Sequence, residues 1–502
     1  MIVTPLRPQR RRPVALLVPG YKALSVFTDD GIRRAKGPSR VYDLLKSLEG
    51  HVCYTTGSVR PMLASTGARA WTADVWRGRA VSLKLYGARV TVHSLRRTLE
   101  GLPPDEAFDA LNEVMDALAD QGVRAGSVSA MSWALWRSTL SSPLDISSDP
   151  RLSRRALYGA RQEAQRPQRV ETPVVAVDLM KAYPSSMAAR PYAGMLRRVS
   201  TSTRLDPDVA GLVEARVSVP DDDEHPFPPL PRRLAPQMIQ WPWGDVEGVW
   251  PWAEVAAAKS LGCEVEVRKV WAPATTLDLF SAWYAYVRRA DELAPRGARL
   301  LKAIANNLWG CFAMEGSDRA TVTWSDDLGF YPEIVPRPPR TMPHLRTAHV
   351  AAETTSRVRV RMLTEALYGG VGEPLHVDTD GYLIDARYAD RVKVGEGPGE
   401  WRIKTRMRVL DLKGPQLYRY LCGEGCGITH EKWHIVAAGI AHDQAREFFE
   451  KVRHGFSISY NGLDAVVPSG RELDPVQVAL YRSQHDQIHS LAYGDPIGAE
   501  VR

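Results

Sequence analysis

Two short apolar segments, far apart in the sequence, each deliver carboxylates at a point where the chain must turn. Residues 174–177 are four apolar, mostly β-branched residues, which predict a buried strand that ends at Asp178. In residues 374–384, apolar residues flank an Asp-Thr-Asp-Gly centre, which predicts two strands joined by a tight turn. The chain must therefore contain a β-sheet that presents acids at strand ends, where they can reach a cleft.

The turn of the second segment places Asp378 and Asp380 close together. Two like charges at this separation repel, and they persist most readily when a divalent cation shares them. Carboxylate oxygens as the only ligands point to Mg²⁺ or Mn²⁺. Simpler interpretations remain open, because Asp178 could cap a following short helix and an acidic turn could be merely solvated.

Residues 299–310 predict an amphipathic helix. Steps of three, four and three residues place one set of side chains on one face, namely Arg299, Lys302, Asn306 and Trp309. The opposite face is apolar and consists of Leu301, Ile304, Ala305 and Leu308. The first face could bind a triphosphate and stack on a base; alternatively, the helix is solvated and Trp309 anchors it in a core.

The composition favours a polyanionic partner and excludes a membrane-spanning chain. Lys and Arg number 65 against 58 Asp and Glu, which gives a formal charge of +7 at pH 7. No stretch approaches the roughly 18 uncharged apolar residues that a transmembrane helix needs, and no apolar run of signal-peptide length follows the basic start. The five cysteines, an odd number, fit a reducing compartment, so we expect the protein in the cytoplasm.

A chain of 502 residues suggests about three domain-sized units. Before residue 150, the sequence mixes strand-like runs with one helical pattern, which predicts an α/β domain; the runs are 14–18, 52–54, 80–85 and 88–92, and the helix is 105–120. Residues 219–253 are acidic and then rich in proline, which predicts a loop or insertion and not a helix.

Four possible zinc ligands follow one another at even spacing: Cys422, Cys426, His430 and His434. Their chemistry suits zinc, but the spacing matches no known finger pattern. A turn at residues 423–425 between two strands already explains why the cysteines would face each other. We therefore do not expect a zinc site here.

The three segments, taken in order, resemble the motifs of a known protein family. The motifs D-x-x-x-A-Y-P-S, K-x-x-x-N-N-x-W-G and H-x-D-T-D-G resemble the palm and fingers motifs of family B DNA polymerases, with separations similar to those of the compact protein-primed branch of phages and linear plasmids. Residues 157–163 resemble the Y-x-G-G/A motif that links the exonuclease and polymerase halves. Residues 414–418 resemble the K-x-Y motif that holds the primer end.

The resemblance implies a multidomain α+β and α/β fold: a right-hand polymerase with palm, fingers and thumb, preceded by a ribonuclease-H-like exonuclease-type domain. The expected parts are a basic flexible arm (1–13), the exonuclease-like domain (14–150), the linking motif and palm with a proline-rich insertion (151–280), the fingers helices (281–315), the palm (316–400) and the thumb (401–502).

The resemblance also implies roles for individual residues. Asp178 and Asp380 would hold two Mg²⁺ or Mn²⁺ ions, with Asp378 in support. Lys302, Arg289 and Arg299 would hold the triphosphate, and Tyr183 would exclude a 2′-hydroxyl from the incoming sugar. The nascent base pair would be lined by Asn306 and Trp309. The primer-template would be contacted by Tyr158, Gly159, Arg161, Lys413, Gln416 and Tyr418.

The implied activity is DNA-directed DNA synthesis from a primer 3′ end. The implied partners are a DNA primer-template, deoxynucleoside triphosphates and, in this branch, a terminal protein or other replication proteins. Two alternatives stay open: a catalytically retired polymerase that binds nucleic acid, and a palm enzyme with primer-independent or RNA-templated synthesis. The departures from the family pattern are Leu157, Lys181, Asn307, Trp309, His376, Gly381 and Gln416. Of these, Lys181 and Gln416 leave room for the latter alternative.

The N-terminal domain lacks the acids that proofreading needs. In the family, the first strand of this domain carries D-x-E, whereas residues 14–18 carry no acid. The second acidic motif would fall near residues 51–60, where neither its Asn nor its Asp is present. Two-metal hydrolysis needs clustered carboxylates, and the nearby Asp29, Asp30 and Asp105 are scattered. We therefore expect a degenerate exonuclease domain without cleavage activity.

Overall fold

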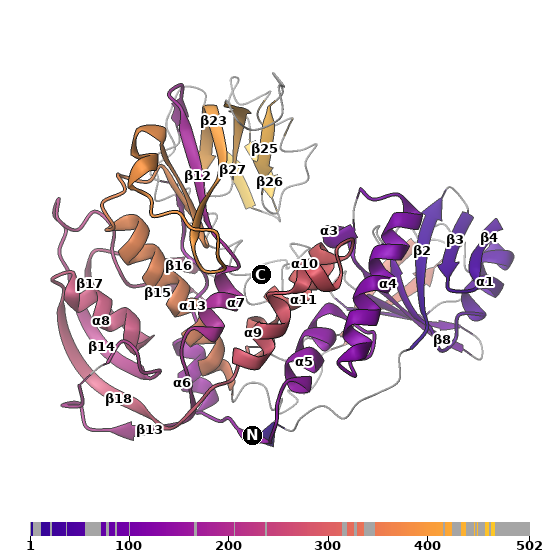
Figure 1. The fold of residues 1–502 in the computed structure, drawn as a ribbon, viewed down its shortest axis with the longest axis horizontal. Coiled ribbons are helices and arrows are strands. Elements are labelled where there is room, and N and C mark those ends of the chain that lie inside the picture. The colour runs from indigo at the N-terminus through magenta and orange to yellow at the C-terminus, as the bar shows by residue number, and fades with distance from the viewer. Residues whose placement is uncertain are drawn as a thin grey trace. The chain divides into compact units, whose positions relative to one another are not determined.

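The structure is a computed structural model, in which helices and strands are labelled as in Figure 1. It describes residues 2–3, 12–20, 23–36, 38–55, 72–76, 80–85, 88–99, 101–164, 168–204, 206–235, 238–313, 319–325, 329–335, 347–414, 417–423, 433–437, 446, 449, 457–460 and 463–466. The chain forms two compact units: the first joins residues 1–145 and 280–345, and the second joins 146–279 and 346–502.

The first unit contains a nine-stranded mixed sheet. Its order is β20 (Gly329–Val335), β19 (Arg319–Ser325), β6 (Thr72–Trp76), β7 (Ala80–Leu85), β8 (Ala88–Ser94), β5 (Val52–Thr55), β2 (Val14–Gly20), β3 (Ala23–Thr28) and β4 (Gly31–Lys36). Strand β2 is antiparallel to β3 and parallel to β5, which is parallel to β8. The four strands expected in this region are confirmed.

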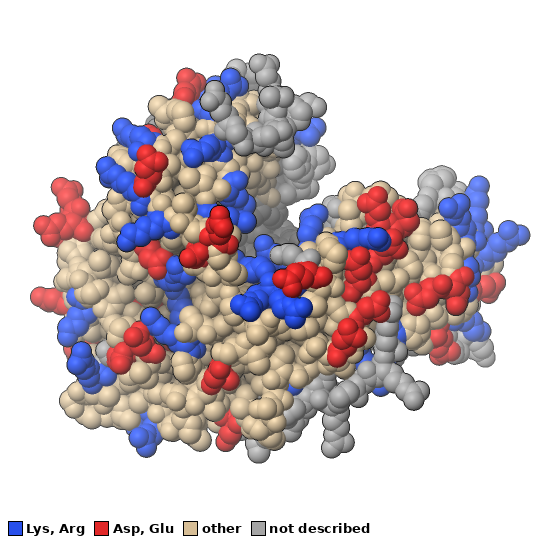
Figure 2. Space-filling view, in the orientation of Figure 1, with Lys and Arg blue, Asp and Glu red and all other residues tan. Residues whose placement is uncertain are grey.

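Helices cover this sheet and extend the first unit. The helix expected over 105–120 is α4 (Pro104–Asp120), and α1 (Pro38–Lys46) packs Val41 and Leu45 into the core of the sheet. Figure 2 shows acidic side chains gathered over α4, where Asp109 and Glu113 hold Arg296. The other helices of the unit are α3 (Arg96–Leu99), α5 (Val128–Ser138), α9 (Ser281–Val287), α10 (Ala290–Leu293), α11 (Ala298–Asn306) and α12 (Leu308–Cys311).

An eight-stranded antiparallel sheet dominates the second unit. Its order is β10 (Gln162–Ala164), β21 (His376–Asp378), β22 (Gly381–Asp385), β12 (Val174–Leu179), β23 (Trp401–Gly414), β24 (Leu417–Cys422) and β25 (His434–Ala437), and β11 (Gln168–Val170) also pairs with β23.

Helix α13 (Ala348–Arg361), which continues into the π-helix η2 (Met362–Leu367), covers one face of this sheet together with α7 (Ala182–Ala188). The core between them contains Val175, Val177 and Val358. The short α6 (Pro150–Arg155) and the 3₁₀ helix η3 (Ala386–Arg391) are further helices of this unit.

The expectation of a plain loop over residues 219–253 is wrong in part. Residues 244–251 form β17 (Gly244–Pro251), a strand of a four-stranded sheet with the order β13 (Tyr192–Val199), β18 (Glu264–Leu277), β14 (Leu212–Val219) and β17; α8 (Trp252–Ser260) follows β17. A hairpin of β15 (Arg232–Ala235) and β16 (Met238–Gln240) lies in the same stretch. Packing of Val246, Val249 and Trp250 in the core outweighs the proline signals.

The described termini add short pairings. Most of the arm expected over 1–13 lies outside the described residues, but β1 (Ile2–Val3) pairs with β9 (Leu144–Asp145). Near the other end, β26 (Ser457–Tyr460) pairs with β27 (Leu463–Val466). In the parts of the chain that the structure describes, no helix has the length and apolar character to cross a membrane. The six-part domain division stays a prediction.

Candidate active site

Asp178 and the Asp-Thr-Asp-Gly turn lie side by side at the centre of the eight-stranded sheet. Gly381 pairs with Asp378 on one side and with Asp178 on the other, so both acids flank one glycine on neighbouring strands. Thr379 adopts a left-handed φ of 60°, and the Leu179 N–H donates to the Asp380 carbonyl at 2.8 Å. The strand and the hairpin predicted from the sequence are confirmed, and tertiary pairing brings their acids together.

Gly381 permits the close approach of these strands. A Cβ atom at this position would lie 2.8 Å from the Val177 carbonyl oxygen, which is closer than real Cβ contacts allow. The resemblance places Ser at this position in the family, so this chain differs where its strands are tightest. We expect Gly381→Ser to lower the free energy of unfolding by about 1–3 kcal/mol because the strands must separate.

Chemical denaturation of the purified variant would measure this cost. Gly126→Ser is the matched control, since neither glycine has a positive φ and the nearest atom to a Cβ at position 126 would lie 3.7 Å away, an ordinary contact. If Gly381→Ser costs no more than Gly126→Ser, the close approach does not limit this position.

Asp380 carries a negative charge that its surroundings disfavour. Burial, and next the charges of Asp178 and Asp378, raise the pKa of its carboxyl to about 7, against the opposing charge of Lys404. A divalent cation would relieve both the burial cost and the repulsion, and carboxylate oxygens suit Mg²⁺ or Mn²⁺. The donor set therefore fits the ions that the sequence implied.

The other two acids have protein partners. Arg402 Nη2 lies 3.0 Å from Asp178 Oδ2, and Lys404 Nζ lies 3.6 Å from Asp178 Oδ1. Gln162 Nε2 donates to Asp378 Oδ1 at 3.3 Å, and the Thr379 hydroxyl donates to the same oxygen at 3.1 Å. In the described ranges, no group of three or more His, Cys, Asp or Glu side chains is arranged so that it could hold a metal ion.

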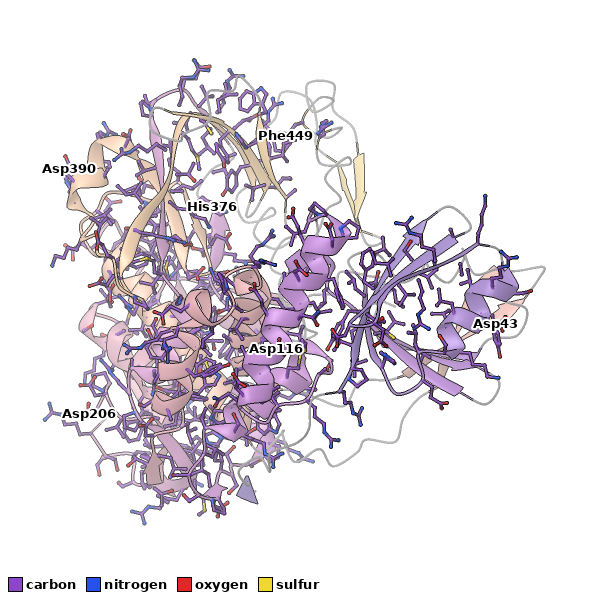
Figure 3. All side chains as sticks on the ribbon, turned by 45° about the vertical axis from the view of Figure 1, so that its right-hand side comes forward. Asp43, Asp116, Asp206, His376, Asp390 and Phe449 are labelled. Carbon is purple, nitrogen blue, oxygen red and sulfur yellow. The ribbon has the colours of Figure 1, made fainter. Side chains whose placement is uncertain are left out.

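Two tyrosines adjoin the acids. Tyr183 lies on α7, just after Lys181, whose φ of 48° turns the chain away from β12. Burial raises the pKa of the Tyr183 phenol, with further contributions from Asp380 and Asp378, so its ring lies within electrostatic reach of both. Burial likewise raises the pKa of Tyr418, whose ring lies 5.4 Å from that of His376. Figure 3 labels His376 among the strands of this sheet.

The linking segment serves the architecture of the second unit. Arg359 Nη1 donates to the carbonyls of Tyr158 and Gly159, each at 2.8 Å. Arg161 is buried, and its guanidinium donates to Glu163 at 2.7 Å and to the Pro228 carbonyl at 2.8 Å. Its carbonyl accepts from the Thr379 N–H at 2.8 Å, which ties this segment to the acidic turn. Contacts of Tyr158, Gly159 and Arg161 with nucleic acid stay predictions.

The region expected to grip the primer is described in part. Lys413 Nζ lies 2.7 Å from the buried Asp411, which also pairs with Arg419 at 3.0 Å. Gln416 lies outside the described residues. The same holds for Cys426 and His430 of the weighed zinc cluster. Cys422 is half-buried and forms no disulfide with the described residues, and His434 stacks on Tyr420.

The basic helix belongs to the first unit, whereas the acids belong to the second. It is α11, which ends at Asn306, and α12 follows it from Leu308. Arg299 and Lys302 are exposed, Asn306 and Trp309 are half-buried, and the apolar face is buried as predicted. Arg289 pairs with Glu292 at 3.0 Å, and Asn307 donates to Ser129 on α5 at 3.0 Å. Their roles at a nucleotide stay predictions.

Sequence reasoning missed three residues that contact the acids, namely Gln162, Arg402 and Lys404. The polar–apolar alternation of residues 401–404 indicates a strand with cations on one face. It does not indicate that this strand pairs with the one that ends in Asp178. Gln162 is missed for the same reason, because β10 pairs with β21 only in the folded sheet.

Comparisons with known proteins show which fold the chain resembles. No family model matches the chain, and no curated protein sequence matches it. A solved structure of Phi29 DNA polymerase, in an orthorhombic crystal form, matches with a TM-score of 0.66 at 11% identity, covering 92% of this chain and 99% of that one. Phi29 DNA polymerase complexed with primer-template DNA and incoming nucleotides matches with a TM-score of 0.65 at 13% identity, covering 89% and 96%. Because identity is this low, the likeness shows the fold alone, which resembles that of a multidomain DNA polymerase.

Proposed function

We propose that this chain is a DNA-directed DNA polymerase that adds deoxynucleotides to a primer 3′ end. The observation that carries the proposal is the convergence of Asp178, Asp378 and Asp380 on Gly381, within a fold that resembles a DNA polymerase over nearly its whole length. These acids also match, in order and spacing, the palm motifs of family B DNA polymerases.

The acids have distinct proposed roles. Asp178 and Asp380 hold two Mg²⁺ or Mn²⁺ ions, and Asp378, which Gln162 orients, supports them. When bound, such ions activate the primer 3′ oxygen and compensate charge on the departing pyrophosphate. Lys302, Arg299 and Arg289 bind the triphosphate, while Asn306 and Trp309 contact the nascent base pair.

The remaining partners follow from the resemblance. Tyr418 and Lys413 contact the primer strand, and the linking segment at Tyr158 guides the template. A terminal protein or another replication protein is a further proposed partner, because the motifs resemble the protein-primed branch. In the part of the chain that the structure describes, Cys53, Cys263, Cys311 and Cys422 form no disulfide, which supports a reducing compartment such as the cytoplasm.

Primer extension tests the proposal and its alternatives. Purified protein with Mg²⁺ or Mn²⁺ should extend a DNA primer on a DNA template with deoxynucleotides. Matched RNA templates, and reactions without a primer, distinguish a DNA polymerase from a palm enzyme with another template or start. Binding of primer-template without any synthesis would instead identify a retired polymerase.

Tyr183 is proposed to exclude ribonucleotides. It is the first aromatic residue after Asp178, the first proposed metal ligand, and it lies just past the turn that follows β12 and near Asp380. We expect Tyr183→Ala to raise ribonucleotide relative to deoxynucleotide incorporation by about 10- to 100-fold, because the ring no longer meets the 2′-hydroxyl. Single-nucleotide incorporation kinetics would measure the ratio.

Tyr183→Phe is the matched control, since it keeps the ring and removes only the hydroxyl. It should retain the discrimination of the natural protein. An unchanged ratio in Tyr183→Ala would assign the exclusion of ribonucleotides to another residue.

The N-terminal domain is proposed to be an exonuclease relic. Its strands β4, β3 and β2 are antiparallel, and β5 and β8 run parallel to β2, as expected for a ribonuclease-H-like sheet. The described strands β2 and β5 bear no acid. Asp29 and Asp30 form the exposed turn between β3 and β4, and Asp105 begins α4; residues 56–60 lie outside the described residues.

We therefore expect no 3′–5′ proofreading. An end-labelled single-stranded oligonucleotide, incubated with Mg²⁺ and without nucleotides, should remain full length, because two-metal hydrolysis needs several converging carboxylates. Steady shortening from the 3′ end that copurifies with the Asp178→Ala variant would refute this. Pyrophosphorolysis at the polymerase site is excluded in that variant.

A further inference from the structure

Two side-chain cations pair with Asp178, one of the carboxylates that are proposed to hold a metal ion. Arg402 and Lys404, both on β23, each approach a different oxygen of Asp178, at 3.0 and 3.6 Å. The side chain of Asp178 is 20% exposed, whereas those of Arg402 and Lys404 are 44% and 58% exposed. The acid is thus held in the sheet, and the two cations are free to reach other partners from the solvent side.

A β-bulge lies beside the two cations of β23 that pair with Asp178. Asp178 pairs in register with Arg402, and Val177 pairs with Ile403, but Ala176 pairs with Thr405. The register shift between Ala176 and Val177 leaves Lys404 as the extra residue of β23. Bulges are frequent next to active sites.

Both cations lie within ion-pair distance of a carboxylate that is proposed to hold a metal ion. Two side-chain cations therefore compensate part of the acidic charge that a divalent ion would otherwise compensate. Binding of an ion between Asp178 and Asp380 brings positive charge next to Arg402 and Lys404, which opposes it.

We propose that Arg402 and Lys404 couple metal binding to DNA binding: they hold Asp178 while the site is empty, and a phosphodiester of the primer strand takes them over when DNA binds. This inference rests on the proposed function and names positioning residues for it. Arg and Lys are the usual phosphate contacts, and their exposure lets a polyanion reach them. Once the side chains of Arg402 and Lys404 contact a phosphate, Asp178 can bind the metal ion.

Thermodynamic coupling of this kind is reciprocal, so DNA should raise metal affinity by the factor by which metal raises DNA affinity. The first experiment needs no DNA. Electron paramagnetic resonance of free Mn²⁺ gives the Mn²⁺ affinity of the natural full-length protein and of its variants. Removing two partly exposed ion partners in R402Q/K404Q should tighten Mn²⁺ binding by about ten-fold.

Two further variants make this measurement decisive. R406Q/R408Q removes the same charge from the same strand, but Arg406 pairs in register with Val175 and not with Asp178. The Mn²⁺ affinity of this variant should therefore stay close to that of the natural protein. Asp178→Asn should weaken Mn²⁺ binding. If Asp178→Asn leaves Mn²⁺ binding unchanged, the metal assignment of the proposed function fails. If it weakens binding while R402Q/K404Q does not tighten it, only the coupling is overturned.

The second experiment measures the reciprocal effect. Fluorescence anisotropy gives the affinity for a labelled primer-template in EDTA and in Ca²⁺, at constant ionic strength. In the natural protein, Ca²⁺ should tighten DNA binding, because the ion holds Asp178 and releases the two cations to phosphate. In R402Q/K404Q the DNA affinity should be lower and independent of Ca²⁺. A Ca²⁺ effect of equal size in this variant would overturn the proposal.

Discussion

Asp380→Asn should abolish primer extension, with a loss of about a thousand-fold or more in rate, and Asp178→Asn should do the same. Removing one group that stabilises developing charge costs about 10²–10³ in rate, and a metal ligand supports both the attacking and the leaving oxygen. Single-turnover extension of a labelled primer with saturating nucleotide and Mg²⁺ would measure the rate.

The raised pKa of Asp380 makes it possible to distinguish this loss of activity from a loss of folding. Because its pKa is raised to about 7, the carboxyl is protonated in the folded state at pH values where it is ionised in the unfolded state. Its contribution to stability is therefore present at low pH and is lost as the pH rises from the unfolded value through 7. Asp380→Asn removes this penalty, so at pH 8 without metal the variant should be at least as stable as the natural protein.

Asp385→Asn is the matched control, because Asp385 is the last residue of β22, the strand that directly follows Asp380. Its carboxylate accepts from the Arg387 N–H at 3.0 Å and caps η3, and Asn caps helices equally well. This variant should keep full activity. Extension by Asp380→Asn at the rate of Asp385→Asn, at equal folded concentration, would refute the assignment of the metal ligands.

Arg359→Gln should lower the free energy of unfolding of the second unit by about 3–5 kcal/mol, since it leaves a buried charge without its partner. Arg359 Nε lies 2.5 Å from Glu254 Oε1, and the side chains of the two residues are only 4% and 2% exposed. The pair joins α13 to α8, and the same guanidinium holds the linking segment at Tyr158 and Gly159. Such a cost is a large part of the roughly 5–15 kcal/mol that stabilises a typical domain.

Urea denaturation would measure this loss, and Arg216→Gln provides the comparison. Arg216 also pairs with an acid, Asp245, but both side chains are nearly half exposed, so its removal should cost far less than that of Arg359. Equal effects of the two substitutions would show that the buried pair does not hold α13 and α8 together. Because Arg359 supports the segment that contacts the acidic turn, its loss should also reduce extension.

The sequence by itself determined the elements that carry the candidate site. Residues 174–177 are β-branched and apolar over the length of a strand, and the Asp-Thr-Asp-Gly centre has the local chemistry of a tight turn. The apolar face of residues 299–310 likewise predicts the buried face of α11. Each of these features depends on neighbours within a few residues, so periodicity and turn chemistry suffice.

Only the tertiary structure decided which of these elements meet. The period of a strand fixes which of its side chains share a face, but it does not name the strand beside it; pairing of β12 with β23 brings Arg402 and Lys404 to Asp178. Similarly, arginines are rarely buried, yet Arg357 and Arg359 are buried. Glu353 lies one turn before Arg357 on the same helix, but Glu254 and the backbone carbonyls that accept from the two guanidinium groups come from other parts of the chain, which no local pattern identifies.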